Sequence, residues 1–339
     1  MKWLDEAVLT APVKYIGCNP VYQIDDSEDV RLAFYRLTRK RDHKVYSWFH
    51  KVMLDRDRNF ITVISKTVVH RALRGCHELV SVMLIEDLID ELGPLIEQRR
   101  LIEGVYIVSR ETYQAVVGLI VNGVQACSAL IDLQTATEIS TELFSQITET
   151  PLPPRPAESY FWQNCEWGLD RRSAAKFVTP PMLVLDDVRN SDNVGAIMRT
   201  AFSFGIRSMV VTKTTMSAIG CRSARTSMGA MNFFSVYVAV DLVETIGVLK
   251  AKGIEVIGTS PRARENITAR PTKQWALVLG NEELGSSDAV MHACSTLAAI
   301  PQVAGDSFSV SVAGGICVYE LMRDHLQAQP PGAIGTGDC

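Results

Sequence analysis

The sequence predicts an α/β protein whose C-terminal half forms a mostly parallel sheet with helices on both faces. From residue 181 onward, short apolar runs alternate with helical segments in regular β-α-β order. Glycine stands just past two of the predicted helices, at Gly205 and Gly253, as is usual at helix C-termini. A chain of 339 residues suits about two domains, and a second, smaller α/β unit is expected before residue 133.

In the C-terminal half, buried strands are predicted at residues 182–185, 208–212, 254–258, 276–279 and 297–300. Helices are predicted at residues 193–204 and 241–252 and from Ser309 to about residue 325. In the smaller unit, strands are predicted at 60–65, 80–84 and 105–109, and helices at 66–74 and 110–119. A parallel sheet of this kind binds ligands outside the carboxyl ends of its strands.

These patterns give five segments. The prediction has a basic N-terminal extension at 1–58, a small α/β unit at 59–132, a linker with four clustered prolines at 133–180, the main α/β domain at 181–325, and a disordered tail rich in Gly and Pro at 326–339.

The densest basic stretch, residues 35–58, carries eight Lys or Arg against three Asp, a local charge of +5 in a chain of net charge -4. Tyr35, Tyr46, Trp48 and Phe49 are interleaved with these charges. One interpretation is a solvated amphipathic helix whose aromatic side chains belong to the core. The other is a surface that holds a phosphate backbone and stacks on bases.

Composition and missing motifs exclude several classes. The chain is 47% hydrophobic and 21% charged, which is ordinary for a globular protein. Eight cysteines without C-x-x-C spacing argue against a structural metal and for a reducing compartment. No apolar run is long enough to span a membrane and the N-terminus lacks a secretion signal, so a cytoplasmic protein is expected, with organelle targeting left open. The glycine motifs of dinucleotide-binding folds and P-loop enzymes do not occur.

Three polar islands each follow a predicted strand. The first runs from Asp187 to Thr200, the second reads Gly-Asn-Glu-Glu-Leu-Gly at 280–285, and the third joins Ile-Pro at 300–301 to Ser-Phe-Ser-Val-Ser-Val-Ala at 307–313. Since all three follow strands of one parallel sheet, they are expected to surround one ligand crevice. Within the first island, Asn193 is expected to cap the helix, with Arg199 nearly two turns later facing the same crevice.

The islands, in this order and spacing, resemble the SpoU family of RNA ribose 2′-O-methyltransferases, within the SPOUT superfamily, from residue 181 to about 323. The resemblance implies S-adenosylmethionine bound in a C-terminal trefoil knot, a homodimer that assembles its site at the knot interface, and no catalytic metal. The residues that match catalytic positions are Arg199, Asn193, Glu282, Ser307 and Ser309. The cofactor contacts implied are Thr259, Gly280, Ile300 and Phe308, mostly through backbone groups.

The resemblance also suggests a role for each residue. Arg199 would stabilise the developing alkoxide or position a phosphate, because a guanidinium with a pKa above about 12 is a poor base. Glu282 would hold the loops together, while Ser307 and Ser309 would orient substrate and cofactor. Arg225 stands in a segment similar to one that lies near the RNA in the family, and is expected to grip a phosphate.

The chain departs from the family at Ser309, where the usual residue is Asn. A hydroxyl keeps a donor and an acceptor but lacks the reach and the second polar group of an amide. The departure motivates a second hypothesis, a catalytically inactive SPOUT-fold protein that binds RNA or assists assembly.

Residues 60–132 bear a looser likeness to the small ribosomal-protein-like domain that precedes the catalytic domain in several rRNA methyltransferases of the family. Residues 121–126 stand where those proteins have a Pro-Gln-Gly turn, so the match is partial. The likeness favours RNA contact by the basic stretch, and rRNA over tRNA as the substrate.

Overall fold

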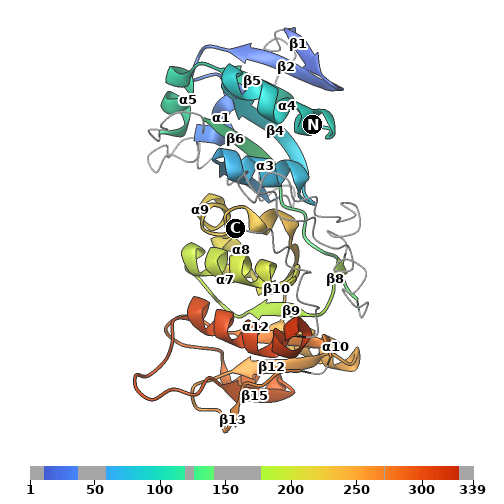
Figure 1. Ribbon diagram of the computed structural model, residues 1–339, viewed down its shortest axis with the longest axis vertical. Helices are drawn as coiled ribbons and strands as arrows, with labels where there is room; N and C mark the ends of the chain where they lie inside the picture. Colours follow the sequence, from blue (N-terminus) through green and yellow to red (C-terminus); the bar gives the residue numbers. More distant parts are fainter. Residues whose placement is uncertain (1–10, 37–58, 119–125, 141–176, 271, 328–339) are drawn as a thin grey trace, which may run out of the picture. The chain divides into compact units, whose positions relative to one another are not determined.

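The structure, a computed structural model, describes residues 11–36, 59–118, 126–140, 177–270 and 272–327. The chain divides into two compact units, Met1–Gln134 and Thr135–Cys339, and each is described by itself (Figure 1). Among the described helices, none combines the length and apolar character that crossing a membrane requires.

The N-terminal unit is a six-stranded mixed sheet of order β1-β2-β5-β4-β6-β3. Its strands are β1 Lys14–Ile16, β2 Asn19–Ile24, β3 Phe60–Ile64, β4 Glu78–Leu84, β5 Gly104–Val108 and β6 Cys127–Asp132. Its helices are α1 Ala33–Arg36, α3 Lys66–Arg74, α4 Ile89–Glu97 and α5 Arg110–Val117, with short 3-10 turns at Val30–Leu32 and Glu86–Leu88. The helices and strands predicted between residues 60 and 119 are confirmed, with ends shifted by up to two residues.

This unit is larger than the sequence predicted. Strand β2 pairs in parallel with β5, so part of the segment assigned to an N-terminal extension belongs to the sheet. Tyr35 is fully buried and its hydroxyl lies 2.9 Å from Ser81 Oγ. Arg36 is also buried and donates to the carbonyl of Ser27. The first aromatic and the first cation of the basic stretch are therefore core side chains, and residues 37–58 lie outside the described residues.

The C-terminal unit is a seven-stranded sheet of order β11-β10-β9-β14-β12-β15-β13, and its strand pairings are parallel. The strands are β9 Met182–Leu185, β10 Ser208–Thr212, β11 Ser235–Ala239, β12 Glu255–Thr259, β13 Glu265–Asn266, β14 Trp275–Leu279 and β15 Thr296–Ala299. The helices are α7 Ser191–Ser203, α8 Lys213–Ala218, α9 Cys221–Thr226, α10 Leu242–Ala251, α11 Asp288–Ala293 and α12 Val310–Gln327.

Helices cover both faces of this sheet. On one face, Leu242 and Ile246 of α10 and Val290 of α11 join a core cluster with side chains of β9, β10 and β14. On the other face, α12 packs closely on the sheet, since a Cβ atom at Gly314 would lie 2.8 Å from Leu279 Cδ1. These two layers confirm the predicted α/β class and explain why the central strands are apolar throughout.

The strand order changes direction at the centre of the sheet. The chain moves outward from β9 through β10 to β11, and then returns to the other side of β9, where β14 is inserted next to it. The carboxyl ends of β9 and β14 therefore meet at the topological switch point, where open α/β sheets bind ligands. On the far side, β15 lies between β12 and β13, which residues 260–264 connect.

Two predictions about segment ends are corrected. Helix α7 begins at Ser191, and its N-cap is Asn190, whose side chain accepts from the Asp192 N–H, so Asn193 is not the cap. The predicted linker is ordered at both ends, where β7 (Glu138–Ile139) pairs in parallel with β8 (Phe177–Val178) in the C-terminal unit. The proline cluster between them and the predicted tail from residue 328 lie outside the described residues.

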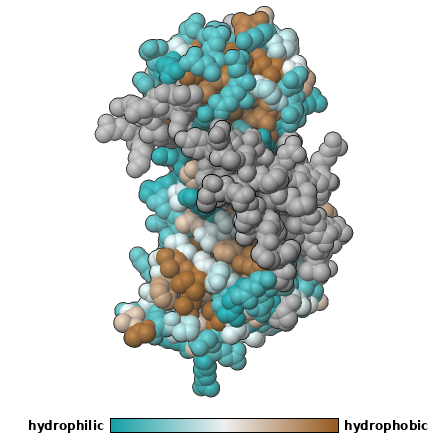
Figure 2. Space-filling view, in the orientation of Figure 1, coloured by the Kyte–Doolittle hydropathy of each residue, from teal (hydrophilic) through white to brown (hydrophobic). Residues whose placement is uncertain are grey.

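Large apolar side chains are exposed near the start of α12. Val312 and Tyr319 are each 50% exposed, and Phe308 in the preceding loop is 40% exposed. Figure 2 shows hydrophobic residues gathered on the C-terminal unit in the region where Figure 1 draws the start of this helix. This part of α12 has an apolar surface that the described residues of the chain leave open.

Candidate active site

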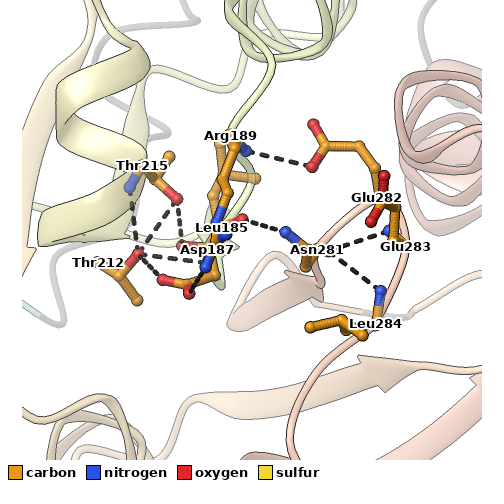
Figure 3. A network of polar contacts seen from close by, with 9 residues as sticks. All are labelled: Leu185, Asp187, Arg189, Thr212, Thr215, Asn281, Glu282, Glu283 and Leu284. Carbon is orange, nitrogen blue, oxygen red and sulfur yellow. Dashed lines mark hydrogen bonds and ion pairs between the residues drawn. The ribbon is translucent and has the colours of Figure 1, made fainter.

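The first two polar islands meet at the switch point of the C-terminal sheet. The backbone N–H of Asp186, just after β9, donates to the carbonyl of Leu279 at the end of β14. Further along the two loops, the Asn281 side-chain amide donates to the carbonyl of Asp187 at 2.8 Å (Figure 3). The predicted juxtaposition of these loops is therefore present in the fold.

Glu282 joins the second loop to the start of α7. Its Oε1 accepts from the backbone N–H of Asn190 at 3.0 Å and from Asn193 Nδ2 at 3.1 Å. Its Oε2 accepts from the backbone N–H of Arg189 at 3.2 Å (Figure 3). Partial burial alone would raise the pKa of Glu282, but the hydrogen bonds from Asn193 and the two backbone groups outweigh burial and lower that pKa. Glu282 is thus an ionised anchor, and Asn193 is one of its donors.

Asp187 fixes the first loop to the neighbouring strand β10. Its backbone adopts a left-handed conformation, with φ of 57°, which Asp tolerates better than most residues. Its N–H donates to Thr212 Oγ1 at 3.2 Å, and the Thr212 hydroxyl donates to Asp187 Oδ1 at 3.1 Å. Burial raises the pKa of Asp187, while hydrogen bonds from Thr214, Arg189 and Thr212 lower it further than burial raises it.

Neither Asp187 nor Thr212 was among the site residues predicted from the sequence. Asp187 has a recognisable signal, because two Asp residues after a buried strand favour a turn, and Asp tolerates the left-handed conformation. Thr212 has no such signal, since a threonine at the end of a strand is common.

Three of the four predicted cofactor contacts lie at the carboxyl ends of adjacent strands. Thr259 ends β12, Gly280 follows β14 and Ile300 follows β15. Thr259 Oγ1 donates to the carbonyl of Val278 at 2.8 Å, which ties two of these ends together. A Cβ atom at Gly280 would overlap the backbone of Ser286, so only glycine fits where the loop folds back.

Arg199 lies on the exposed side of α7, and within the described part of the chain its guanidinium has no hydrogen bond or ion pair. Ser309 stands directly before α12, with its Oγ 3.4 Å from Ser311 Oγ, and Ser307 is exposed in the same loop. Helix α12 packs on α7 one residue from Arg199, because a Cβ atom at Gly315 would lie 3.5 Å from Thr200 Cγ2. The structure thus places Arg199 and the two serines on neighbouring elements, without a hydrogen bond between them among the described residues.

Arg225 is exposed on α9, which packs tightly on α7. A Cβ atom at Gly195 would lie 2.7 Å from the carbonyl oxygen of Ser223. One turn before Arg225, the Arg222 guanidinium binds both carboxylate oxygens of Asp192, with Nε 2.8 Å from Oδ1. This contact fixes α9 beside the first loop and leaves Arg225 facing solvent.

Comparison with known proteins identifies this half of the chain. The model of the SpoU rRNA methylase family matches residues 180–319, which span all three islands. The chain carries a SpoU-family domain. The 23S rRNA (guanosine-2′-O-)-methyltransferase RlmB of Nitrosomonas europaea is 32% identical over 153 residues, which are 44% of this chain and 59% of that protein. RlmB of Vibrio vulnificus is 32% identical over 157 residues, 46% of this chain and 64% of that protein.

The match spans less than two thirds of these curated relatives. Solved structures extend the likeness at the level of the fold. An rRNA methyltransferase from Sinorhizobium meliloti has a TM-score of 0.62 at 19% identity, and the match covers 90% of this chain and 98% of that one. The SpoU methyltransferase AviRb from Streptomyces viridochromogenes, in complex with AdoMet, has a TM-score of 0.60 at 14% identity. The match covers 88% of this chain and 100% of that one. The SpoU domain and its surroundings therefore have a fold known from methyltransferases.

Proposed function

We propose that this chain is an S-adenosylmethionine-dependent RNA ribose 2′-O-methyltransferase that acts on rRNA. The observation that carries the proposal is the switch-point site of the SpoU domain, where Glu282 binds Asn193 and the start of α7 while Arg199 on the same helix remains unpaired among the described residues. The names of the RlmB relatives support a ribose hydroxyl of rRNA as the acceptor.

The residues at the strand ends fit the cofactor. Gly280 lets the second loop fold back onto Ser286, which fixes the loop at the end of β14 where the cofactor would bind. Thr259 ends the adjacent strand β12, and Ile300 follows the next strand, β15. S-adenosylmethionine would supply an electrophilic methyl group on its sulfonium, and solved relatives of this fold bind AdoMet. Half burial raises the pKa of Asp186 in the same crevice, so this carboxyl is less acidic than its neighbour Asp187.

The remaining site residues would align the ribose and stabilise charge. Transfer to a hydroxyl requires the two reactants in line and the loss of the hydroxyl proton. Arg199 would stabilise the alkoxide that develops on the ribose oxygen, because its guanidinium stays charged and is free of partners among the described residues. Ser307 and Ser309, exposed before α12, would orient substrate and cofactor. Glu282 would act as a positioning residue, since donors already occupy both of its oxygens.

We further propose that the C-terminal segment is threaded into a trefoil knot and that two copies form a homodimer. Insertion of β15 between β12 and β13 supports threading, because the short connection at 260–264 crosses the end of β15 and residues 300–309 then lead back to α12 on the sheet. The exposed Val312 and Tyr319 support a partner on α12, because large apolar side chains gain stability when water is excluded from them.

For the N-terminal unit we propose substrate RNA binding, with residues 37–58 as the basic segment that contacts RNA. The charge of this segment supports the assignment, since counterion release from phosphates drives such binding. An extra unit of this kind favours rRNA over tRNA. A cytoplasmic location follows from the proposed substrate, because the named relatives are bacterial rRNA enzymes.

A specific observation favours a second function. Ser309 replaces the amide that the family usually has before the last helix, and its hydroxyl faces only Ser311 among the described residues. An inactive SpoU-domain protein that binds RNA would also retain the loop contacts of Glu282, because these contacts stabilise the fold.

Calorimetry and a transfer assay distinguish the two functions. The proposal expects binding of S-adenosylmethionine and transfer of a tritiated methyl group to rRNA transcribed in vitro, with the methyl mapped to a ribose. Absence of binding at millimolar cofactor would refute the enzyme. Transfer to a base would retain an enzyme and refute the ribose assignment.

A further inference from the structure

We propose that Arg189 binds a backbone phosphate of the substrate RNA and that Asp187 is the positioning residue that aims it. The proposal rests on the proposed function and extends it, because neither residue was among the site residues that the sequence indicated. The Arg189 side chain is held at the edge of the switch-point site.

Arg189 is fixed at its backbone and at one corner of its guanidinium. Its N–H donates to Glu282 Oε2 at 3.2 Å, which sets its Cα beside the second island. Its Nη2 lies 3.3 Å from Asp187 Oδ2, the single side-chain contact that the described residues give it. The side chain is nevertheless 63% exposed. A guanidinium has five N–H donors, so most remain available to an oxyanion outside.

A surface ion pair alone would not offset the conformational free energy of Asp187. Exposed pairs contribute about 0–1 kcal/mol, whereas a left-handed residue other than glycine costs on the order of 1 kcal/mol. At this position, φ is 57°, and glycine would adopt that conformation without penalty. The carboxylate has two uses here, because one oxygen fixes the loop and the other contacts Arg189. Its Oδ1 is held by the Thr212 hydroxyl at 3.1 Å, which leaves Oδ2 directed at Arg189 (Figure 3).

The position of Arg189 suits a phosphate within a few nucleotides of the reacting one. It stands two residues before α7, and Arg199 lies eight residues into that helix from Ser191, about 12 Å at 1.5 Å per residue. That separation corresponds to a few nucleotides of RNA backbone. Since the chain carries a net charge of -4, local cations of this kind must supply its attraction for phosphates.

The test compares RNA binding and methyl transfer in the full chain and its variants, with rRNA transcribed in vitro as the probe. Arg189→Ala is expected to raise KM roughly tenfold with kcat unchanged. It should also lower the slope of log K against log salt by about 0.7 to 0.9, as expected for the loss of one phosphate contact. Arg323→Ala is the matched control, because Arg323 also pairs with a carboxylate on the surface, near the far end of α12.

Asp187→Gly tests positioning and is expected to fold, since glycine adopts the left-handed backbone freely. It should raise KM several-fold in the native background and have no further effect on KM in the Arg189→Ala background. Equal effects in both backgrounds would show that Asp187 acts through the fold and would overturn its role.

Three results separate this inference from the proposed function. A native protein that neither binds rRNA nor transfers a methyl group overturns both. A native protein that does both, with an unchanged salt slope in Arg189→Ala, overturns the phosphate contact alone. A reduced slope in Arg189→Ala and in Arg323→Ala alike shows only general loss of positive charge and also overturns the contact.

Discussion

Replacing Glu282 by Gln tests whether this side chain anchors the two loops. Gln keeps one oxygen acceptor and puts an NH₂ group in the place of the other. If the oxygen faces Asn190 and Asn193, the new NH₂ group opposes the backbone N–H of Arg189. If the amide is flipped, the NH₂ group instead opposes the backbone N–H of Asn190 and the side-chain amide of Asn193. Either way at least one donor loses its acceptor, and the remaining bonds lose the charge that strengthens them.

The expected loss is about 1–2 kcal/mol of unfolding free energy at pH 7, because hydrogen bonds to charged groups contribute roughly 1.5–3 kcal/mol and solvent screening reduces this at a half-buried site. For a unit of this size the loss corresponds to a fall of roughly 2–8 °C in Tm. Thermal unfolding followed by circular dichroism measures it. Glu283→Gln is the matched control, because the neighbouring Glu283 is exposed and only its backbone N–H bonds to Asn281.

The difference between native protein and variant should depend on pH. The pKa of Glu282 in the folded chain lies below its ordinary value of 4.5, so the carboxylate stabilises the fold fully above that value. As pH falls through the folded pKa, the carboxylate is protonated and its contribution disappears. The Tm difference should therefore be constant from pH 6 to 8 and shrink below about 4.5. A variant as stable as the native protein at pH 7, or a difference that persists unchanged at low pH, would refute the anchoring role.

Three more substitutions follow from the site. Gly280→Ala puts a methyl group onto the backbone of Ser286 and is expected to cost about 1–3 kcal/mol and to weaken S-adenosylmethionine binding in calorimetry. Gly247→Ala is its control, because nothing lies near that position on α10 and the change should stabilise the helix by about 0.5–1 kcal/mol. Arg199→Ala should abolish methyl transfer and spare Tm and cofactor binding, and retained transfer would contradict its role. Ser309→Asn should raise transfer to rRNA in the tritium assay; if native protein and variant are both inactive while binding RNA, the noncatalytic function is favoured.

The sequence predicted the five inner strands of the C-terminal sheet because they are short and largely apolar, but it did not predict the edge strands β11 and β13. Strands such as β9 and β10 need only a local pattern to be recognised, and both match the predicted ranges. In contrast, β2 has polar and half-buried residues along one side. Its place in the sheet depends on a partner far away in the chain, which local patterns do not report.

Contacts between residues far apart in the chain also explain why the roles of some site residues were not predicted. Asn193 was predicted to cap a helix, which requires only a polar residue near a helix start, but the chain has Asn190 for that purpose. The Asn193 side chain instead donates a hydrogen bond to Glu282, 89 residues away. Similarly, the sequence left Tyr35 either in the core or on a surface that contacts RNA, and the fold buries it against Ser81.

By itself, the sequence determined which residues are candidates for the chemistry of this protein, since the three islands, Arg199, Glu282 and the departure at Ser309 can all be recognised in it. The tertiary structure alone decided how they are held. Insertion of β14 beside β9 brings loops a hundred residues apart within hydrogen-bond distance, and the bonds from Asp187 to Thr212 and from Glu282 to α7 then fix them. Such contacts depend on strand order, which no local pattern specifies because it is set by the packing of the whole sheet.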